Sequence, residues 1–435
     1  MAEMKDSGIH AIGRIPKEWN VVRTKYLSNI SIGLVTTMTE NYVEKEEGVP
    51  LIRNGNIRCN KIDVNGMVFL DKRFAEKNKH RQLHTGQIAT VHTGEVGTSI
   101  VIPEEYDGGL GFATIQSTPY KGVSSEFLCW FYNSAAFKNQ CIECSTGDGR
   151  QNLNLYDFVD LFVAIPKYDL QSKIASFLDK KCAEIDSLHT DIEKQIETLE
   201  EYKKSIITEA VTKGLNPDVE MKDSGIEWVG MIPKNWNLSR LKYELETSMK
   251  YGASEAGVEY SDDLPRYIRI TDITNDNRLK TEGKLSLTEK QANGYMLEKD
   301  TVLFARSGGT VGKTFLYKPE YGKAAFAGYL ISAIPDKEKM QAEWLYYFSL
   351  SNAYWDWANQ IFTQATIQNI GADKYSNLPI PIPSIDIQNA IVNYLNKKCA
   401  EIDDIITDKK KQLKILEQYK KSLIYEYVTG KKEVQ

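Results

Sequence analysis

Lys180-Lys181-Cys182-Ala183-Glu184-Ile185-Asp186 returns unchanged as residues 397–403. A second string, Met4-Lys5-Asp6-Ser7-Gly8-Ile9, returns as residues 221–226 at the same offset of 217 residues. Because the chain is 435 residues long, two copies fill it almost completely. A repeat of this length is far longer than a solenoid unit, so it predicts two duplicated domains.

The repeated heptapeptides lie in two segments predicted to be long helices, about residues 170–212 and 387–429. Apolar residues recur there at alternating steps of three and four, which is typical of a coiled-coil seam. The predicted seam comprises Ile185, Leu188, Ile192, Leu199, Tyr202 and Ile206 in the first helix, and Ile402, Ile405, Leu413, Leu416, Tyr419 and Leu423 in the second. Matching seams favour antiparallel pairing within the chain, with a pseudo-two-fold relation between the copies. The alternatives are that each helix packs on its own domain or dimerises with another chain.

Each copy begins with a leading segment, residues 4–27 and 221–244, in which 15 of 24 aligned residues are identical. Its Ile-Pro-Lys-x-Trp core predicts a turn whose proline fixes the backbone. Trp19 and Trp236 are predicted to anchor this turn to a core.

The leading segment is followed in each copy by a body, residues 28–168 and 245–385. Short alternating runs punctuated by Gly, Asn and Asp predict short strands and tight turns, with one helix near the end, at 125–130 and 342–347. The predicted fold class is α/β, with two sheet-rich domains that are each followed by a long helix. The predicted domains are 1–168, 169–213, 214–385 and 386–435.

Composition narrows the class of protein. Hydrophobic residues make up 42% of the chain and charged residues 26%, which is ordinary for a globular protein. We expect neither a membrane-spanning segment nor a signal peptide. Six cysteines are too few for a disulfide framework and favour a reducing cytoplasm. A net charge of −5 does not by itself indicate nucleic-acid binding, although local basic strips can bind phosphate on an acidic protein.

Three further motifs occur twice in register. The first is the leading signature Ser-Gly-Ile-x-x-x-Gly-x-Ile-Pro-x-x-Trp. The second is the strand that leads to each long helix, residues 161–166 and 378–383, followed by Gln171 and Gln388. The third is the end of the first long helix, residues 202–212, which is repeated in the second helix from Tyr419 onward. Together they resemble the specificity subunit of Type I restriction–modification enzymes, over essentially the whole chain.

The resemblance implies a definite function. The bodies would be two target recognition domains that each read one half of a split, asymmetric DNA sequence. The helices would fix the spacer between the halves and dock two methyltransferase subunits. The chain would catalyse nothing and hold no cofactor. S-adenosylmethionine would belong to the methyltransferase subunits, and ATP and Mg would belong to restriction subunits.

A rival motif, residues 307–314, reads Ser-Gly-Gly-Thr-Val-Gly-Lys-Thr and misses the P-loop pattern by one residue, at Ser307. In the other copy, Thr98 stands where Lys313 would supply the phosphate ligand. Three interpretations stay open: an NTPase, a glycine turn between strands, or a turn at DNA where Arg306 and Lys313 meet phosphate or guanine. A helical adaptor that binds proteins is a further alternative for the whole chain.

Other chemistry finds little support. The chain lacks the Asn/Asp-Pro-Pro-Tyr/Phe loop that adenine methylation needs, and its nearest string is Asn216-Pro217-Asp218. Cys141 and Cys144 form a C-x-x-C without a second pair, so we predict packing residues and no metal site.

Candidate DNA contacts are Arg, Lys, Asn, Gln and small polar residues near turns, because several of these pair with base edges. Each could equally be a solvated turn residue. In the first body the candidates are Arg53, Asn54, Asn56, Arg58, Thr93, Glu95, Arg150, Gln151 and Asn152. In the second body they are Arg269, Thr271, Arg306, Ser307, Lys313, Gln364, Thr366 and Gln368.

Overall fold

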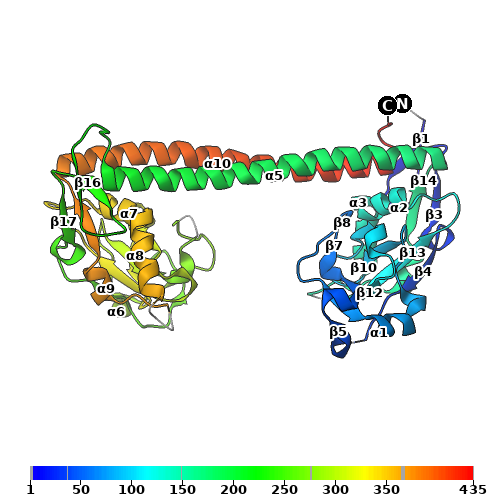
Figure 1. Ribbon diagram of the computed structural model, residues 1–435, viewed down its shortest axis with the longest axis horizontal. Helices are drawn as coiled ribbons and strands as arrows, with labels where there is room; N and C mark the ends of the chain where they lie inside the picture. The colour runs from blue at the N-terminus through cyan, green and yellow to red at the C-terminus, as the bar shows by residue number, and fades with distance from the viewer. Residues whose placement is uncertain (1–2, 37, 148, 275–276, 364–367, 435) are drawn as a thin grey trace. The chain divides into compact units, whose positions relative to one another are not determined.

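A computed structural model describes residues 3–36, 38–147, 149–274, 277–363 and 368–434. The chain divides into two units. Unit 1 comprises residues 1–192 and 410–435, and unit 2 comprises residues 193–409. Each long helix contributes one part to each unit, because α5 is Tyr168–Lys213 and α10 is Ile385–Val428 (Figure 1). The predicted four-segment division of the chain stays a prediction.

Unit 1 contains two four-stranded sheets, which we call sheet A and sheet B. Sheet A has the order β11-β10-β13-β4, with strands Ser99–Val101, Ile88–Val91, Thr114–Pro119 and Ser28–Ile32. Sheet B has the order β12-β6-β9-β5, with strands Leu110–Phe112, Gly48–Arg53, Val68–Asp71 and Tyr42–Val43.

Unit 2 repeats both sheets with the same strand order. Its sheet A is β23-β22-β25-β18, with strands Thr314–Leu316, Val302–Ala305, Leu330–Ala333 and Lys250–Tyr251. Its sheet B is β24-β20-β21-β19, with strands Ala324–Phe326, Arg266–Ile268, Leu285–Ser286 and Val258–Glu259. The two bodies therefore share one topology, although their sequences share only short islands.

Two-stranded pairs complete each unit. In unit 1 these are β1 Met4–Asp6 with β2 Arg14–Pro16, β3 Asn20–Arg23 with β14 Phe162–Ile165, and β7 Ile57–Arg58 with β8 Lys61–Ile62. In unit 2 they are β15 Met221–Asp223 with β16 Met231–Pro233, and β17 Asn237–Arg240 with β26 Pro379–Ile382.

Shorter helices complete the bodies. They are α1 Lys72–Lys77, α2 Ser125–Asn133, α3 Ala135–Cys144 and α4 Leu155–Phe158, followed by α6 Glu289–Ala292, α7 Ala342–Leu350, α8 Asn352–Thr363 and α9 Ala372–Ser376. The described residues contain no helix long and apolar enough to cross a membrane.

The prediction of one helix near the end of each body was wrong, because two consecutive helices occur there. Ser134 separates α2 from α3, and Ser351 separates α7 from α8, both with extended backbone. Each serine hydroxyl donates to the carbonyl three residues earlier, at 2.6 Å, so it competes with the helical hydrogen bond at that point.

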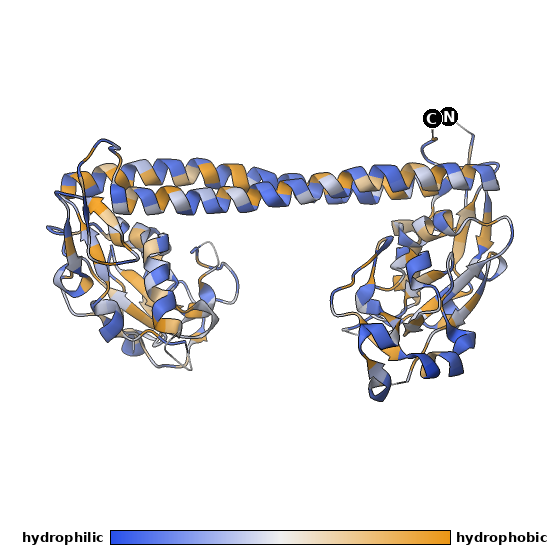
Figure 2. Cartoon of the chain, viewed as in Figure 1, coloured by the Kyte–Doolittle hydropathy of each residue, from blue (hydrophilic) through white to orange (hydrophobic). Residues whose placement is uncertain are grey.

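The predicted tryptophan anchors are confirmed. Trp19 meets Phe127 of α2 edge to face, with ring centroids 6.3 Å apart, and Trp236 meets Trp344 of α7 in the same way at 5.6 Å. Apolar residues of the bodies belong to the same core clusters as these tryptophans. Figure 2 shows the apolar segments of both bodies in orange. Aromatic pairs of this geometry add about 0.5–1.5 kcal/mol beyond their buried area.

The long helices pair antiparallel within each unit, as predicted. In unit 1, Asp186 of α5 accepts from Lys420 of α10 at 2.5 Å, and the rings of Phe177 and Tyr427 pack at a tilt with centroids 4.4 Å apart. In unit 2, Asp403 of α10 accepts from Lys203 of α5 at 2.7 Å. The helices also pack on their bodies, since the Trp130 indole donates to Asp179 at 2.8 Å.

The predicted seam was partly wrong. Leu188, Tyr202, Ile405 and Tyr419 are between 47% and 57% exposed. The buried or half-buried positions run at steps of three and four through Cys182, Ile185, His189, Ile192, Ile196, Leu199, Lys203 and Ile206. Polar His189 and Lys203 occupy seam positions. The prediction placed their apolar neighbours Leu188 and Tyr202 in the seam instead, because it relied on hydrophobicity.

Candidate nucleic-acid interface

Three loops of unit 1 that are far apart in sequence meet at one end of sheet A. The Asn54 amide donates to the Thr93 carbonyl at 3.2 Å. Thr93 also donates to the Asn152 side chain at 3.1 Å, and the backbone of Gly94 donates to the Gln151 carbonyl at 2.8 Å. The structure therefore brings Asn54, Thr93, Gln151 and Asn152 together, four of the residues that were predicted to contact DNA.

Several candidates around this cluster have structural partners. Asn56 is 2% exposed, and its side chain accepts from the Arg53 backbone at 3.1 Å and donates to the Asp63 carbonyl at 2.8 Å. Arg53 donates to the Gly66 carbonyl, and Arg58 donates to Asp63 at 3.1 Å. Asn56 therefore closes a turn, and its amide offers nothing to a ligand in this state.

Glu95 and Arg150 are exposed at the edge of the same cluster. Glu95 lies in the turn between β10 and β11, and Arg150 immediately precedes Gln151. Both are more accessible than Asn54, Thr93, Gln151 and Asn152, which are half-buried.

Unit 2 builds the corresponding turn with an ion pair. Arg269 donates to both carboxylate oxygens of Asp272, at 2.9 and 2.8 Å, and to the Gly283 carbonyl at 2.9 Å. Hydrogen bonding to Asp272 raises the pKa of Arg269. Arg269 thus fixes the turn, while neighbouring Thr271 is exposed.

The segment resembling a P-loop is a hairpin. Strands β22 and β23 pair antiparallel, and Gly308–Thr310 forms a single turn between them. A P-loop lysine opens a helix at its phosphate site, whereas Lys313 here is followed directly by β23. The segment is therefore a turn between strands, and the NTPase interpretation loses its structural basis; the interpretation as a turn at DNA stays a prediction.

Arg306 and Ser307 begin this hairpin loop. Ser307 forms a β-bridge with Asn369, so the segment after α8 reaches the loop as Asn152 does in unit 1. Lys313, at the end of the loop, is half-buried, and Gln368 is exposed. Gln364 and Thr366 lie outside the described residues.

Sequence reasoning missed two residues at these loops. His92 directly follows β10, and its Nδ1 lies 2.7 Å from the Thr93 hydroxyl; burial lowers the pKa of His92, which keeps the imidazole neutral near pH 7. Tyr251 ends β18, and its ring lies 4.8 Å from the Arg306 guanidinium carbon. Superposing the two sheets strand by strand would have found both.

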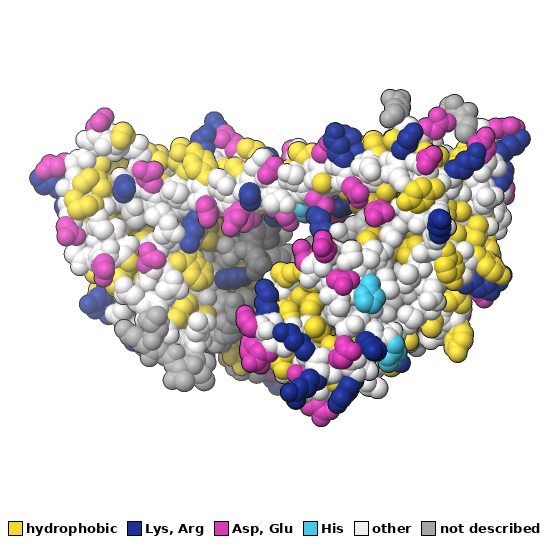
Figure 3. All heavy atoms as spheres, turned by 45° about the vertical axis from the view of Figure 1, so that its right-hand side comes forward, with side chains coloured by type: hydrophobic (Ala, Val, Ile, Leu, Met, Phe, Trp, Pro, Cys, Tyr) yellow, Lys and Arg dark blue, Asp and Glu magenta, His cyan; other side chains and the backbone are white. Residues whose placement is uncertain are grey.

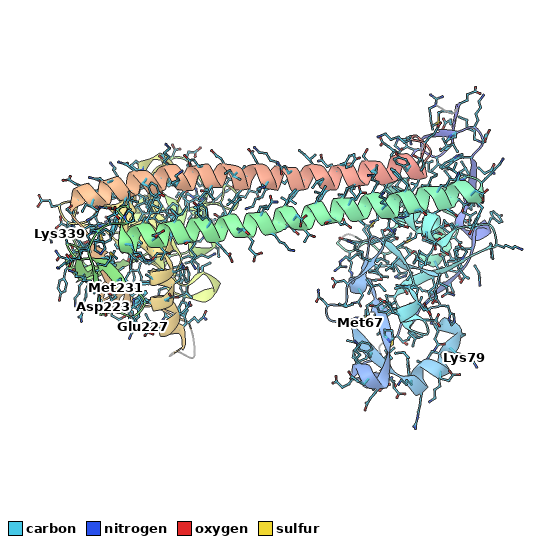
Figure 4. All side chains as sticks on the ribbon, turned by 45° about the horizontal axis from the view of Figure 1, so that its top comes forward. Met67, Lys79, Asp223, Glu227, Met231 and Lys339 are labelled. Carbon is cyan, nitrogen blue, oxygen red and sulfur yellow. The ribbon has the colours of Figure 1, made fainter. Side chains whose placement is uncertain are left out.

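A basic segment of unit 1 was also missed. Lys72, Arg73, Lys77 and Lys79 are exposed within eight residues, with Glu76 as the acidic side chain among them. Figure 3 shows dark-blue side chains gathered at this end of the unit, and Figure 4 shows Lys79 on the part of the body remote from the long helices. Such a segment suits phosphate binding, despite the negative charge of the whole chain.

The described residues include no group of three or more His, Cys, Asp or Glu side chains that could hold a metal ion. All six cysteines are free; Cys141 is buried on α3 and Cys144 is exposed. Burial raises the pKa of both Cys141 and Cys144 above the ordinary thiol value, so neither is activated as a thiolate.

Comparison with known proteins gives one consistent result. Residues 16–198 and 238–415 match the family described as Type I restriction modification DNA specificity domain. The StySPI specificity subunit of Salmonella potsdam is 23% identical over 90% of this chain and 84% of its own length. The MjaVIII specificity subunit of Methanocaldococcus jannaschii is 24% identical over 97% of this chain and 95% of its own.

Two solved structures share the fold. A chain from the work described as "Structural basis underlying complex assembly and conformational transition of the type I R-M system" has a TM-score of 0.71 at 14% identity, covering 95% of this chain and 98% of that one. The HsdS subunit from Thermoanaerobacter tengcongensis has a TM-score of 0.50 at 14% identity, covering 96% and 98%.

Proposed function

Because this chain belongs to the family of Type I restriction–modification specificity subunits, which recognise DNA and are not catalytic, we propose that its two bodies read the two halves of a split, asymmetric DNA target. One observation carries the proposal. The two bodies have the same strand order in both sheets but different side chains in the loops at the end of sheet A. A shared scaffold with different loops suits two readers of different bases.

The loop clusters supply the expected chemistry. Amide, hydroxyl and guanidinium groups that lie at strand ends can donate to or accept from base edges. Asn54, Thr93 and Asn152 contribute such groups in unit 1, and Arg306 and Ser307 contribute them in unit 2. Of the remaining predicted contacts, Arg58, Glu95, Arg150, Thr271 and Gln368 are exposed.

We further propose that α5 and α10 set the spacing between the two half-sites. Support comes from the antiparallel pairing of α5 with α10 in both units, and from ion pairs at equivalent positions, Asp186 with Lys420 and Lys203 with Asp403. A rigid connection between two base-reading modules makes half-site spacing a geometric property of the protein.

Exposed apolar residues on the same helices support docking of two identical partners. Leu188 and Ile405 occupy equivalent positions and are 52% and 47% exposed, and Tyr202 and Tyr419 are 57% and 51% exposed. Large apolar side chains that recur on both halves of a duplicated scaffold suit two copies of one subunit. In this proposal the partners are two methyltransferase subunits.

The chemistry would reside in the partners. Methyltransferase subunits would hold S-adenosylmethionine, and restriction subunits would hold ATP and Mg for cleavage. The target is DNA, so we place the assembled complex in the cytoplasm.

Sequencing the methylated bases of a host that carries this chain and its methyltransferase subunit tests the split target. We expect methylated adenines in one two-part motif with a fixed spacer. Exchange of residues 28–168 for the body of another specificity subunit should alter one half of the motif only. A continuous motif, or a change in both halves, would contradict the proposal, and an unmethylated genome with intact partner binding would favour a protein-binding adaptor.

A further inference from the structure

His92 directly follows β10 of unit 1, and Arg306 directly follows the equivalent strand β22 of unit 2. The two residues occupy the same backbone position in their sheets. In unit 1, the backbone of Leu153 donates to the His92 carbonyl at 2.9 Å, and Thr93 bridges Asn152. In unit 2, the backbone of Ile370 donates to the Arg306 carbonyl at 2.9 Å, and Ser307 bridges Asn369. The backbone therefore holds His92 and Arg306 with the same neighbouring contacts, and the two positions differ in their side chains.

The Arg306 side chain has no hydrogen-bonding partner among the residues that the structure describes. Its Nε is buried without a partner, and its guanidinium forms no hydrogen bond or ion pair within the described part of the chain. A half-buried guanidinium without acceptors is unfavourable unless a ligand supplies them. Guanine offers two acceptors, N7 and O6, in the geometry that an arginine fork matches.

Tyr251 holds this guanidinium in place. The Arg306 carbon lies 4.8 Å from the ring centroid, and the tyrosine hydroxyl accepts from the Ala372 backbone at 3.0 Å at the start of α9. The ring is thereby fixed from its far end. Stacking on an aromatic ring orients the guanidinium plane while leaving its N–H groups available.

Unit 1 has a different pair at the same positions. Ile32 pairs with Ile115 as Tyr251 pairs with Ile331, so Ile32 is the counterpart of Tyr251. His92 replaces Arg306 and is held by the Thr93 hydroxyl at 2.7 Å, with no aromatic ring beneath it at the equivalent position. The aromatic support is present in the unit that carries arginine and absent in the unit that carries histidine.

We propose that this position, His92 in unit 1 and Arg306 in unit 2, determines one base pair of each half-site, and that Tyr251 positions Arg306 to read guanine. The inference rests on the proposed DNA recognition and adds the residues that set specificity. His92 reads a base through its ring nitrogen facing away from Thr93, and Arg306 through its guanidinium fork.

The test uses the full chain assembled with its methyltransferase subunits and reads the methylated motif base by base. Arg306→Ala should relax one position of one half-site, with a roughly 10- to 100-fold loss of preference for guanine. Arg306→Lys keeps the charge without the fork and should relax the same position. Lys318→Ala, which removes an exposed charge from the same unit, should leave the motif unchanged.

Tyr251 is tested as a positioning residue. Tyr251→Leu should weaken discrimination at the position that Arg306 reads while affecting overall DNA affinity less. Tyr251→Phe keeps the ring and should restore most of the discrimination, which a merely structural role would not predict. Loss of affinity for all sequences alike in Tyr251→Leu would overturn the positioning role.

A transplant provides the opposite test. His92→Arg together with Ile32→Tyr should introduce a guanine preference at one position of the other half-site, and His92→Arg alone should do so less. If a variant abolishes methylation, binding of the assembled complex to four duplexes that differ at the implicated base pair decides instead. Equal binding to all four by Arg306→Ala supports the inference, and a retained preference overturns it.

Failure of the inference differs from failure of the proposed function. A wild-type complex without a two-part motif would contradict the function itself. A two-part motif that stays unchanged in Arg306→Ala and in His92→Ala would leave the function standing and reject these positions as readers.

Discussion

Gln171 shows how one buried side chain joins two parts of a unit. Its side chain accepts from the Ser124 backbone at 2.8 Å, where α2 begins, and donates to the Pro166 carbonyl at 2.9 Å, just before α5. Gln388 repeats both contacts with Gln341 and Pro383 in unit 2. Both glutamines were visible in the sequence as part of a repeated motif, but the backbone donors Ser124 and Gln341 lie 47 residues before them and appear as partners only in the fold.

We expect Gln171→Leu to lower the free energy of unfolding by about 2–4 kcal/mol, because it leaves a buried N–H and a buried carbonyl without partners. Urea denaturation measures the change. Lys173→Ala, on the exposed side of the same helical turn, is the control and should change stability by less than about 0.5 kcal/mol. Equal effects of the two substitutions would contradict the role of Gln171.

The ion pair between Asp186 and Lys420 is predicted to depend on pH. Burial alone would raise the pKa of Asp186, but hydrogen bonds and charge from Lys420 and Lys61 outweigh it and hold the pKa below its ordinary value. A carboxyl with a depressed pKa in the folded state stabilises the fold above its unfolded pKa of about 3.9, and this contribution is lost as pH falls through the folded value.

Lys420→Ala should therefore destabilise unit 1 by about 1–2 kcal/mol at pH 7, since the pair is half-buried. The difference from wild type should shrink below about pH 4 as Asp186 becomes protonated. Denaturation midpoints at pH 7 and pH 3.5 measure it. Lys181→Ala breaks an exposed pair with Glu184 on the same helix and serves as the control; a pH-independent difference for Lys420→Ala would contradict the prediction.

At the scale of elements, the basic segment that begins with α1 predicts a contact to DNA phosphates. Replacing Lys72, Arg73 and Lys77 by alanine should weaken binding to all sequences alike and reduce the slope of log K against log salt by about 2–3. The methylated motif should stay the same. A change in the motif would indicate base contacts instead.

The long helices predict separate docking positions for the partner subunits. Leu188→Asp with Tyr419→Asp alters only unit 1, and Ile405→Asp with Tyr202→Asp alters only unit 2. Each double variant should lose one methyltransferase subunit, and the combination should lose both, as mass measurement of the assembled complex would show. Ser187→Asp and Lys421→Asp change exposed polar neighbours and should retain both subunits.

The seam of these helices marks a limit of periodicity. The steps of three and four and the positions of Ile185, Ile192, Leu199 and Ile206 were correct, but Leu188 and Tyr202 were assigned one residue away from the seam positions of His189 and Lys203. In a pair of helices, polar seam residues can be satisfied by the partner helix, as Lys203 is by Asp403 at 2.7 Å. A hydrophobic pattern alone cannot identify such a polar seam residue, because the residue that stabilises it lies 200 positions away in the chain.

At the scale of the molecule, the spacing proposal predicts the effect of lengthening the helices. Insertion of four residues into 170–212, with four matching residues in 387–429 to preserve the seam, adds about 6 Å of helix. The preferred spacer should lengthen by about one to two base pairs while both half-sites stay the same. Altered half-site bases with an unaltered spacer would contradict the proposal.

The duplication, the helical segments, the tryptophan anchors and the family resemblance all followed from the sequence, because each depends on residues close together in the chain or on comparison of one copy with the other. Loop residues such as Asn54, Thr93 and Arg306 could be named as candidates from residue type alone. Their roles could not be assigned, because Arg306 is distinguished by a ring at position 251 and Asn56 by a carbonyl at position 63. Only the tertiary structure decided which polar groups are satisfied within the protein and which remain for a ligand, because satisfaction depends on strands and loops that the sheet brings together.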